Sequence, residues 1–380
     1  MQINASPNDM QAAGPQQMPD KDLSLYVAPQ WKLIWWKFRK HRLAVFSAVV
    51  VLLIYGVALT AEFFAPFDPE AFAARYTYAP PQPINWFHEG QFMPHVNGYQ
   101  VEVNTESMSR TFVLDEEQVI PIRFFAEGHA YKLLGLIDTN IHLVGPVDED
   151  DPMFLLGADR LGRDVLSRII YGARISMSIG LIGVTISLVI GIILGGISGY
   201  YGGWVDNLIQ RLIEFIRSLP TIPLWMALAA ALPLTWPPLQ MYLAITIILS
   251  FIGWTDLARV VRSRYLSLRG EDFVTAVDLD GASQQRIMFR HMLPAFYSHI
   301  IASLTLAIPG MILAETALSF LGLGLRPPTI SWGVLLQEAQ NLRSVATAPW
   351  LLTPAIAVIV AVLALNFLGD GIRDAADPYM

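Results

Sequence analysis

The chain lacks cysteine and carries few charged residues. Only 15 % of its 380 residues are charged and 54 % are hydrophobic, whereas soluble domains average about 25 % charged residues. The absence of cysteine excludes disulfide frameworks, Cys-ligated zinc, iron–sulfur clusters and thiol catalysis. The formal net charge of −7 gives no support for nucleic-acid binding. So little charge implies a surface that faces something other than water, which predicts an integral membrane protein.

Motifs for nucleotide binding and for hydrolysis are also missing. The sequence contains no Walker A loop (G-x-x-x-x-G-K-[ST]), no His-Glu-x-x-His and no Gly-x-Ser-x-Gly, which excludes these routes to ATP, zinc-protease and serine-hydrolase chemistry. The histidines are scattered, and the acidic run Asp148 to Asp151 lacks the glycine and terminal glutamate of a calcium loop. We therefore expect a chain that is not an enzyme, with no catalytic residue, no metal ligand and no cofactor of its own.

Six stretches are apolar and long enough to cross a membrane, for which a helix needs about 20 residues. The expected spans are Leu43–Phe64, Ile175–Ile197, Leu208–Leu232, Met241–Leu257, Ala295–Leu323 and Trp350–Leu368. Two charged residues and two prolines interrupt the third span: Glu214, Arg217, Pro220 and Pro223. They are tolerated only where other helices or a water-filled cavity satisfy them. The predicted fold class is an all-α polytopic membrane protein with six transmembrane helices.

Basic residues near the span ends predict the orientation. They are frequent over 32–42, before the first span, and over 259–290, between the fourth and fifth spans, so both segments are expected on the cytoplasmic side. The segment after the first span is acidic and falls on the outer side. Both termini are then cytoplasmic, with 1–28 as a disordered polar tail and 371–380 as a short C-terminal segment.

Two segments flank the first span (43–64). Residues 29–42 interleave aromatic and basic side chains, which suits an amphipathic interfacial helix; the alternative is a continuous extension of the span. Residues 65–171 are long enough for an outer insertion of mixed α/β structure, with strands expected at Tyr99–Val103 and Thr111–Leu114. Its aromatic residues, Trp86 and Phe87 among them, either form a small core or touch a solute or an outer partner protein.

The segment Gly270–Pro294 (GEDFVTAVDLDGASQQRIMFRHMLP) has the pattern of a docking element. We expect a helix over Asp272–Leu279, a turn at Gly281 and a second, basic helix that ends at Leu293-Pro294. A short helix that projects from membrane spans suits insertion into a groove on another protein. The small residues Ala276, Gly281 and Ala282 would allow close approach of the backbone.

This segment resembles the EAA motif of the permease subunits of bacterial ABC importers, E-A-A-x-x-x-G followed by x-L-P. It is most similar to the peptide-type permeases, the second (C-type) subunit of dipeptide and oligopeptide importers. Further stretches resemble the same family: Leu156–Ser176, Gly199–Asp206, Glu315–Gly324 and Gly371–Pro378.

The resemblance implies that 259–294 is the cytoplasmic coupling loop of a permease core over 172–370. The residues expected to dock on an ATPase subunit are Thr275, Ala276, Val277, Gly281, Ala282, Arg290, Leu293 and Pro294. The motif usually has Glu and Ala at the places of Thr275 and Val277, and Asp278 and Asp280 also depart from it. The charges of this docking surface therefore differ from the usual ones.

The resemblance further implies that the chain forms half of a pore in the bacterial cytoplasmic (inner) membrane. Peptides are the default solute; oligosaccharides or, less often, nickel complexes are the alternatives. The expected partners are a second homologous permease, one or two ABC ATPases that bind ATP and Mg, an outer solute-binding protein and membrane lipids. No nucleic acid is expected.

Three charged residues in the spans are pore or gate candidates: Glu315, Glu214 and Arg217. A carboxylate at membrane depth is costly unless it is paired or hydrated, so Glu315 should face the bundle or the pore. It either contacts the solute and gates the pathway, or is a structural hydrogen-bond partner of a neighbouring helix. Glu214 and Arg217 are three residues apart on a helix, a spacing that allows them to pair.

Four charged residues lie where the outer insertion re-enters the membrane: Arg160, Arg163, Asp164 and Arg168. They are candidates for an ion-pair latch or a seat for the solute-binding protein, and anchoring to lipid phosphate is the alternative. Two other functions are compatible with a membrane protein of this kind, a membrane enzyme with an outer catalytic domain and an ion-gradient-driven transporter. The docking element favours the ABC permease, because neither of the others requires it.

Overall fold

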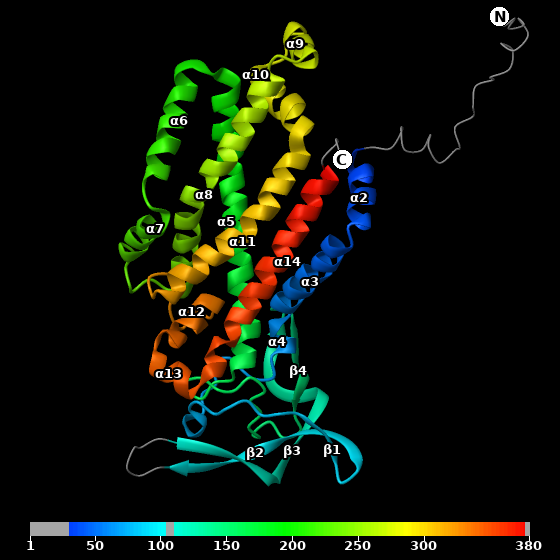
Figure 1. Cartoon of the computed structure of the whole chain (residues 1–380), viewed down its shortest axis with the longest axis vertical. Coiled ribbons are helices and arrows are strands. Elements are labelled where there is room, and N and C mark those ends of the chain that lie inside the picture. Colours follow the sequence, from blue (N-terminus) through cyan, green and yellow to red (C-terminus); the bar gives the residue numbers. More distant parts are fainter. Residues whose placement is uncertain (1–29, 104–109, 377–380) are drawn as a thin grey trace, which may run out of the picture.

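The computed structural model describes residues 30–103 and 110–376; the predicted tail (1–28) and the last four residues of the chain lie outside this range. The helices form an elongated bundle with an antiparallel sheet at one end (Figure 1). The short helix α9 (Asp272–Leu279) projects from the opposite end, where α2 (Gln30–Lys40) and the end of α14 (Thr353–Ala376) also lie. We call these the sheet end and the α9 end.

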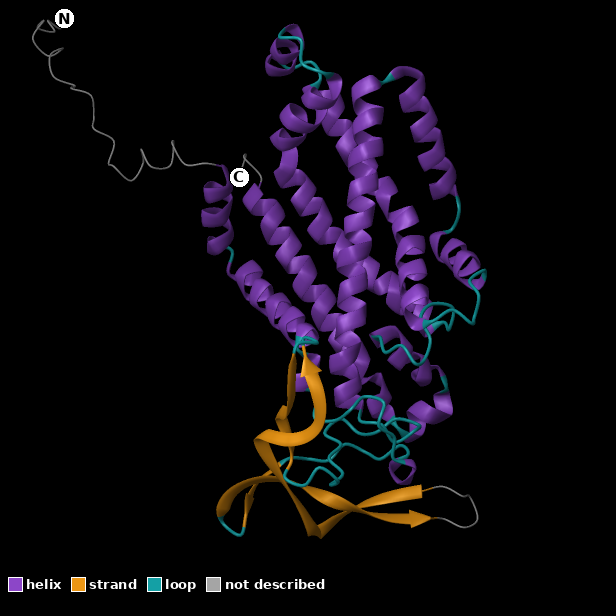
Figure 2. Cartoon of the chain, turned by 180° about the vertical axis from the view of Figure 1, so that it is seen from behind, coloured by secondary structure: helices purple, strands orange, loops and turns teal. Residues whose placement is uncertain are grey.

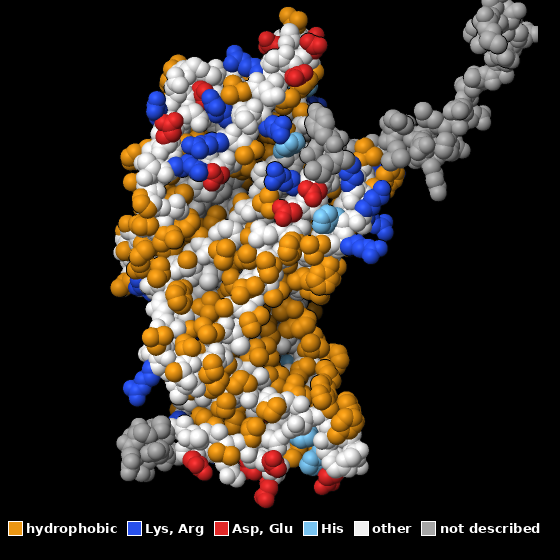
Figure 3. All heavy atoms as spheres, viewed as in Figure 1, with side chains coloured by type: hydrophobic (Ala, Val, Ile, Leu, Met, Phe, Trp, Pro, Cys, Tyr) orange, Lys and Arg blue, Asp and Glu red, His pale blue; other side chains and the backbone are white. Residues whose placement is uncertain are grey.

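Five helical segments are long and apolar enough to cross a membrane: α3 (Arg42–Leu59), α5 (Val165–Tyr201), α8 (Pro238–Leu268), the run Gln284–Phe320 that contains α11 (Tyr297–Phe320), and the run Pro349–Ala376 that contains α14. They confirm five of the expected spans. Figure 3 shows a broad hydrophobic band on this face, between charged groups gathered at the two ends. Such a band is the surface expected of a bundle in a lipid bilayer.

The third predicted span is not one continuous helix. Helices α6 (Gly203–Ser218) and α7 (Thr221–Ala230) replace it and meet at an angle of 86°. Leu219 is extended (φ −87°, ψ 138°), as expected for a residue before proline, whose ring disfavours the helical conformation of its predecessor. Pro220 therefore ends α6, and the chain turns before α7 begins.

Two helices extend beyond the predicted apolar stretches. Helix α5 begins at Val165, so the outer insertion ends at residue 164 rather than 171. Helix α8 continues to Leu268, so residues 259–268, predicted as part of the coupling loop, are helical. The prediction stopped short because arginines interrupt both extensions, Arg168 and Arg174 in α5 and Arg259 and Arg262 in α8, although apolar residues continue around them.

Close backbone contact between α5 and α8 explains the glycines near the end of α5. A Cβ atom at Gly195 would lie 2.5 Å from the carbonyl oxygen of Ala258, and one at Gly199 would lie 2.6 Å from that of Arg262. Small residues allow helices to approach closely inside a membrane. Arg262 also pairs with Asp206 of α6 at 2.5 Å, which ties α6 to the same pair of helices.

The outer insertion is a four-stranded antiparallel sheet in chain order: β1 (Asn85–His88), β2 (Gln91–Val103), β3 (Arg110–Leu133) and β4 (Ile137–Pro146). Figure 2 shows the sheet and its loops below the bundle. Both predicted strands are confirmed, within β2 and β3. The expected mixture with helix is wrong for the described part of 65–164, where the helical structure is one 3₁₀ turn, Ala74–Tyr76. Strand β3 is long enough to pair with β2 along its first half and with β4 along its second.

The N-terminal helix α2 is separate from α3. The chain is not helical at His41, whose side chain accepts a hydrogen bond from the backbone N–H of Ala44 at 3.1 Å and caps α3. The alternative of a continuous extension of the first span is therefore wrong. The location of α2 in the membrane interface stays a prediction. Between α3 and the sheet, α4 (Ala61–Phe64) completes the predicted first span.

Candidate functional site

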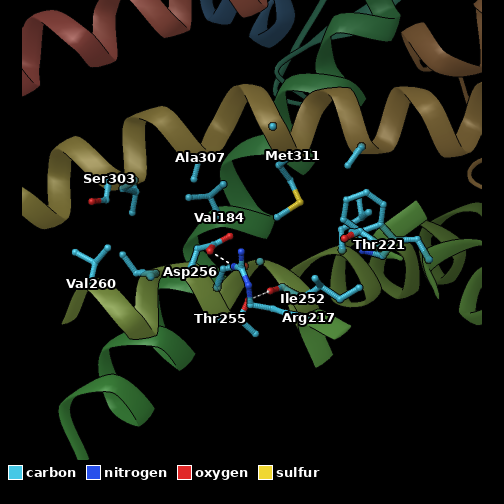
Figure 4. A pocket seen from close by; sticks show the side chains of 18 residues that line it. Val184, Arg217, Thr221, Ile252, Thr255, Asp256, Val260, Ser303, Ala307 and Met311 are labelled. Carbon is cyan, nitrogen blue, oxygen red and sulfur yellow. Dashed lines mark hydrogen bonds and ion pairs between the residues drawn. The ribbon is translucent and has the colours of Figure 1, made fainter. Parts of the chain in front are cut away.

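A cavity of about 430 Å³ opens between α6, α7, α8, α5 and α11. Its wall is mostly apolar, with a few polar side chains: Ser187, Arg217, Thr221, Thr255, Asp256 and Ser303. Figure 4 shows Arg217 and Asp256 joined across this space, with Thr221 and Met311 nearby. The indole Nε1 of Trp225, which also lines the cavity, is buried and has no hydrogen-bond partner in the described structure. The mostly apolar wall of the cavity thus contains one ion pair and one indole N–H that has no acceptor.

The ion pair differs from the predicted one. Arg217 donates to the Asp256 carboxylate of α8, and Glu214 pairs with Arg211 at 2.8 Å. Because α6 ends at Ser218, its last turn carries Arg217 toward α8, whereas Glu214 is not among the residues that line the cavity. Sequence reasoning missed Asp256. The signal for it was an acidic residue within the apolar run of the fourth span.

Glu315 of α11 is fully buried at the sheet end of the bundle and does not line this cavity. Its Oε1 accepts hydrogen bonds from Ser319 at 2.8 Å and Ser331 at 2.7 Å, and its Oε2 accepts one from Ser176 at 3.2 Å. Each serine oxygen in turn accepts a backbone N–H, from Leu325, Val334 and Trp332 respectively. This geometry agrees with the structural alternative for Glu315.

The docking element has the predicted shape. Helix α9 spans Asp272–Leu279, and Gly281 follows with φ +78°, a left-handed conformation that suits glycine. The predicted second helix is present as α10 (Gln284–Arg286), a π-helical turn (Ile287–Met292) and a 3₁₀ turn (Leu293–Phe296). The predicted helix over Asp272–Leu279 and the turn at Gly281 are therefore confirmed. The predicted second, basic helix is present but consists of α-, π- and 3₁₀-helical turns in succession.

The residues predicted to couple differ in exposure and fall into three groups. Thr275, Ala276, Gly281, Arg290 and Pro294 are exposed, and Val277 and Ala282 are half-buried. Leu293 is buried in a cluster with Tyr265 and Val274, which fixes α9 on the end of α8. Two exposed side chains that sequence reasoning left out, Phe273 and Leu279, lie on α9 itself. The surface of this helix is thus apolar and acidic, with Asp272, Asp278 and Asp280 exposed around it.

The predicted outer cluster is brought together at the sheet end. The Asp159 carboxylate, absent from the prediction, pairs with Arg163 at 2.7 Å and with Arg168 at 3.5 Å. Asp164 caps α5 by accepting from the backbone N–H and hydroxyl of Ser167, both at 2.7 Å. Burial raises the pKa of Asp164 to about 6, against the lowering effect of these hydrogen bonds.

A second acidic residue at the sheet end, Glu338, contacts the same cluster. The backbone N–H of Arg160 donates to Glu338 at 2.9 Å, and burial raises the pKa of the Glu338 carboxyl.

Trp86 and Phe87 of β1 are exposed and contact Phe92. They therefore form no core, and they lie outside the cavity at the sheet end that Arg160, Arg163, Arg168 and Arg326 line.

The structure is thus a helical bundle with a broken span, a mostly apolar cavity that contains an ion pair, and a short helix that projects from one end. Residues 187–380 match the family of binding-protein-dependent transport system inner membrane components, and the chain belongs to this family. Residues 29–81 match the N-terminal TM domain of oligopeptide transport permease C.

Three relatives illustrate the similarity. The chain is 40 % identical to the dipeptide transport system permease protein DppC of Alkalihalophilus pseudofirmus, over 59 % of this chain and 71 % of that protein. It is 38 % identical to the oligopeptide transport system permease protein OppC of Escherichia coli (strain K12), over 63 % and 78 %. It is 30 % identical to DppC of Haemophilus influenzae, over 94 % and 98 %. This last similarity extends over nearly the whole chain, whereas the two family models leave residues 82–186, which include the outer sheet, unmatched.

Proposed function

We propose that this chain is the C-type permease subunit of a peptide importer in the bacterial inner membrane. A second homologous permease forms the other half of the pore. One or two ATPases bind ATP and Mg on the cytoplasmic side, and a solute-binding protein delivers the peptide from outside. The names of the relatives support peptides as the solute.

The observation that carries the proposal is the Arg217–Asp256 pair. Its side chains are 38 % and 75 % exposed, and Asp256 lies at the end of the apolar run of α8, just before the arginine-bearing extension 259–268. A charged group that faces lipid is costly unless it is paired or hydrated. An exposed ion pair at this position suits a face of α6, α7 and α8 that meets water or another protein chain, as the wall of a shared pathway would.

The α9 end would then face the cytoplasm and the ATPases. Helix α9 offers an exposed Leu279 within a ring of carboxylates, so the groove that receives it should combine an apolar pocket with a basic rim. The start of α2 and the end of α14 lie at this end. Helix α2 would lie in the cytoplasmic membrane interface, with its basic last turn at the lipid headgroups.

Reconstitution of the four kinds of subunit in liposomes tests the solute. We expect uptake of labelled tri- or tetrapeptides that requires ATP and the binding protein. Uptake of oligosaccharides or of chelated nickel in place of peptides would contradict the proposal. An empty-liposome control and a variant ATPase that cannot hydrolyse ATP define the background.

The orientation is tested in a chain that has no cysteine of its own. We expect an impermeant thiol reagent to label Glu117→Cys, in the exposed part of β3, in intact spheroplasts. Ser283→Cys, at the α9 end, should react only after lysis. The reverse pattern would contradict the assignment of the sheet end to the outside.

A further inference from the structure

A second cavity, of about 520 Å³, lies at the sheet end between the loop before α5 and the segment of α12 (Trp332–Gln337) and α13 (Leu342–Thr347). Four arginines line it: Arg160, Arg163, Arg168 and Arg326. Figures 1 and 2 show α12 and α13 on the same side of the bundle as α6 and α7. The cavity therefore lies outward of the wall that carries Arg217 and Asp256.

The positive charges in this cavity exceed the negative ones. Asp159 is shared by Arg163 and Arg168, and Glu338 is the one acid among the lining residues. The Arg326 guanidinium donates to a neutral acceptor, the carbonyl oxygen of Gly322, at 3.1 Å. In the described part of the chain, the guanidinium of Arg160 donates no hydrogen bond. Two carboxylates thus face four guanidinium groups.

Arg168 is the most buried member of the cluster. It is 4 % exposed, one Nη donates to the carbonyl oxygen of Pro69 at 2.8 Å, and its Nε lies 3.5 Å from the Asp159 carboxylate without forming a hydrogen bond. Asp159 also pairs with Arg163 at 2.7 Å, so one carboxylate serves two guanidinium groups. An anion in the cavity would add to the negative charge that these two arginines share.

We propose that this cavity binds the free C-terminal carboxylate of the arriving peptide, an inference that rests on the proposed function. A guanidinium group matches a carboxylate with two parallel hydrogen bonds, and Arg160 has these donors free. Amide and hydroxyl side chains on the same wall suit the peptide backbone: Tyr78, Gln337, Gln340, Asn341 and Ser344. The carboxylate would be held here before the peptide enters the pathway.

The test compares a peptide that has a free C-terminal carboxylate with the same peptide as its C-terminal amide, in the complete reconstituted transporter. The measured quantity is the uptake rate of the free acid divided by that of the amide. The binding protein contributes equally to this ratio in every permease variant. Arg160→Gln should lower this ratio about tenfold, the effect of losing a charged hydrogen bond. Arg160→Lys, which keeps the charge, should lower it less. Arg343→Gln removes a charge from exposed α13 outside the cavity and should leave the ratio and the rates unchanged.

The outcomes separate this inference from the proposed function. An unchanged ratio in Arg160→Gln overturns the inference, whether the two rates stay constant or fall by the same factor. An equal fall would show that Arg160 serves transport without recognising the peptide carboxylate. If the wild-type transporter imports oligosaccharides and no peptide, the proposed function fails and this inference fails with it. Assembly of each variant is checked by size-exclusion chromatography of the complex.

Discussion

Arg174 of α5 donates two hydrogen bonds to the Glu62 carboxylate of α4, at 2.8 and 2.7 Å. The same guanidinium donates to the carbonyl oxygens of Ala58 and Leu59, at 3.0 and 3.1 Å, where α3 ends. One side chain thus satisfies the unpaired carbonyls at a helix end and joins the first span to the second.

Arg174→Gln should therefore destabilise the protein. We expect a loss of about 1–3 kcal/mol in the free energy of unfolding, since partly buried acceptors lose a charged donor. The measurement is thermal unfolding in detergent. Arg211→Gln is the matched control, because its pair with Glu214 is exposed and such pairs contribute at most about 1 kcal/mol. Equal losses in the two variants would contradict the prediction.

The Arg217–Asp256 pair should act as a unit in transport. Arg217→Gln and Asp256→Asn should each slow ATP-driven uptake, because each leaves one unpaired charge on the cavity wall. The double variant should be no slower than the worse single one, with a coupling energy of about 0.5–3 kcal/mol. Losses that simply add would show that the two groups work independently.

Leu279 should be needed for coupling and not for folding. It is 84 % exposed, so Leu279→Ala should leave thermal stability unchanged while reducing the ATPase activity stimulated by the loaded binding protein several-fold, as truncation of an interface anchor does. The matched control is Leu342→Ala, 85 % exposed on α13 at the sheet end. Normal stimulation in Leu279→Ala would argue against docking through α9.

Asp164 should make stability depend on pH. Burial raises its pKa from 3.8 to about 6, so the folded protein binds this proton more tightly than the unfolded chain. Its contribution is favourable at low pH and is lost as the pH rises from about 4 through about 6. Asp164→Asn should flatten the fall in melting temperature over this window while keeping the helix cap. Asp138→Asn, at an exposed position of β4, should keep the wild-type slope.

Local patterns in the sequence predicted the local structure well. The bounds of α9 and the turn at Gly281 follow from a short amphipathic stretch that ends in glycine, and five spans follow from hydropathy. The break before Pro220 was visible as prolines in an apolar run. That run is long enough to span if straight, and its straightness depends on packing, which hydropathy does not record.

The partners of the charged residues were much harder to predict. Arg217 pairs with Asp256, 39 positions away, and Arg174 pairs with Glu62, 112 positions away. Such pairs form because helices meet in three dimensions, whereas sequence spacing suggests only near neighbours such as Glu214. The outer arginines were correctly placed in one cluster because they are close in the chain, but the acids that complete the cluster were not found.

The hydrogen bonds of the Glu315 carboxylate limit how the helices of the bundle can move relative to one another. It holds α5 through Ser176, its own helix α11 through Ser319, and the start of α12 through Ser331. These three elements cannot separate at the sheet end without leaving a buried acceptor unsatisfied, which is costly. Opening and closing of the bundle must then carry them as a single block. Leu219 and Pro220, the extended residues between α6 and α7, lie outside that block. They are therefore the place where the backbone can act as a hinge while the block keeps its shape.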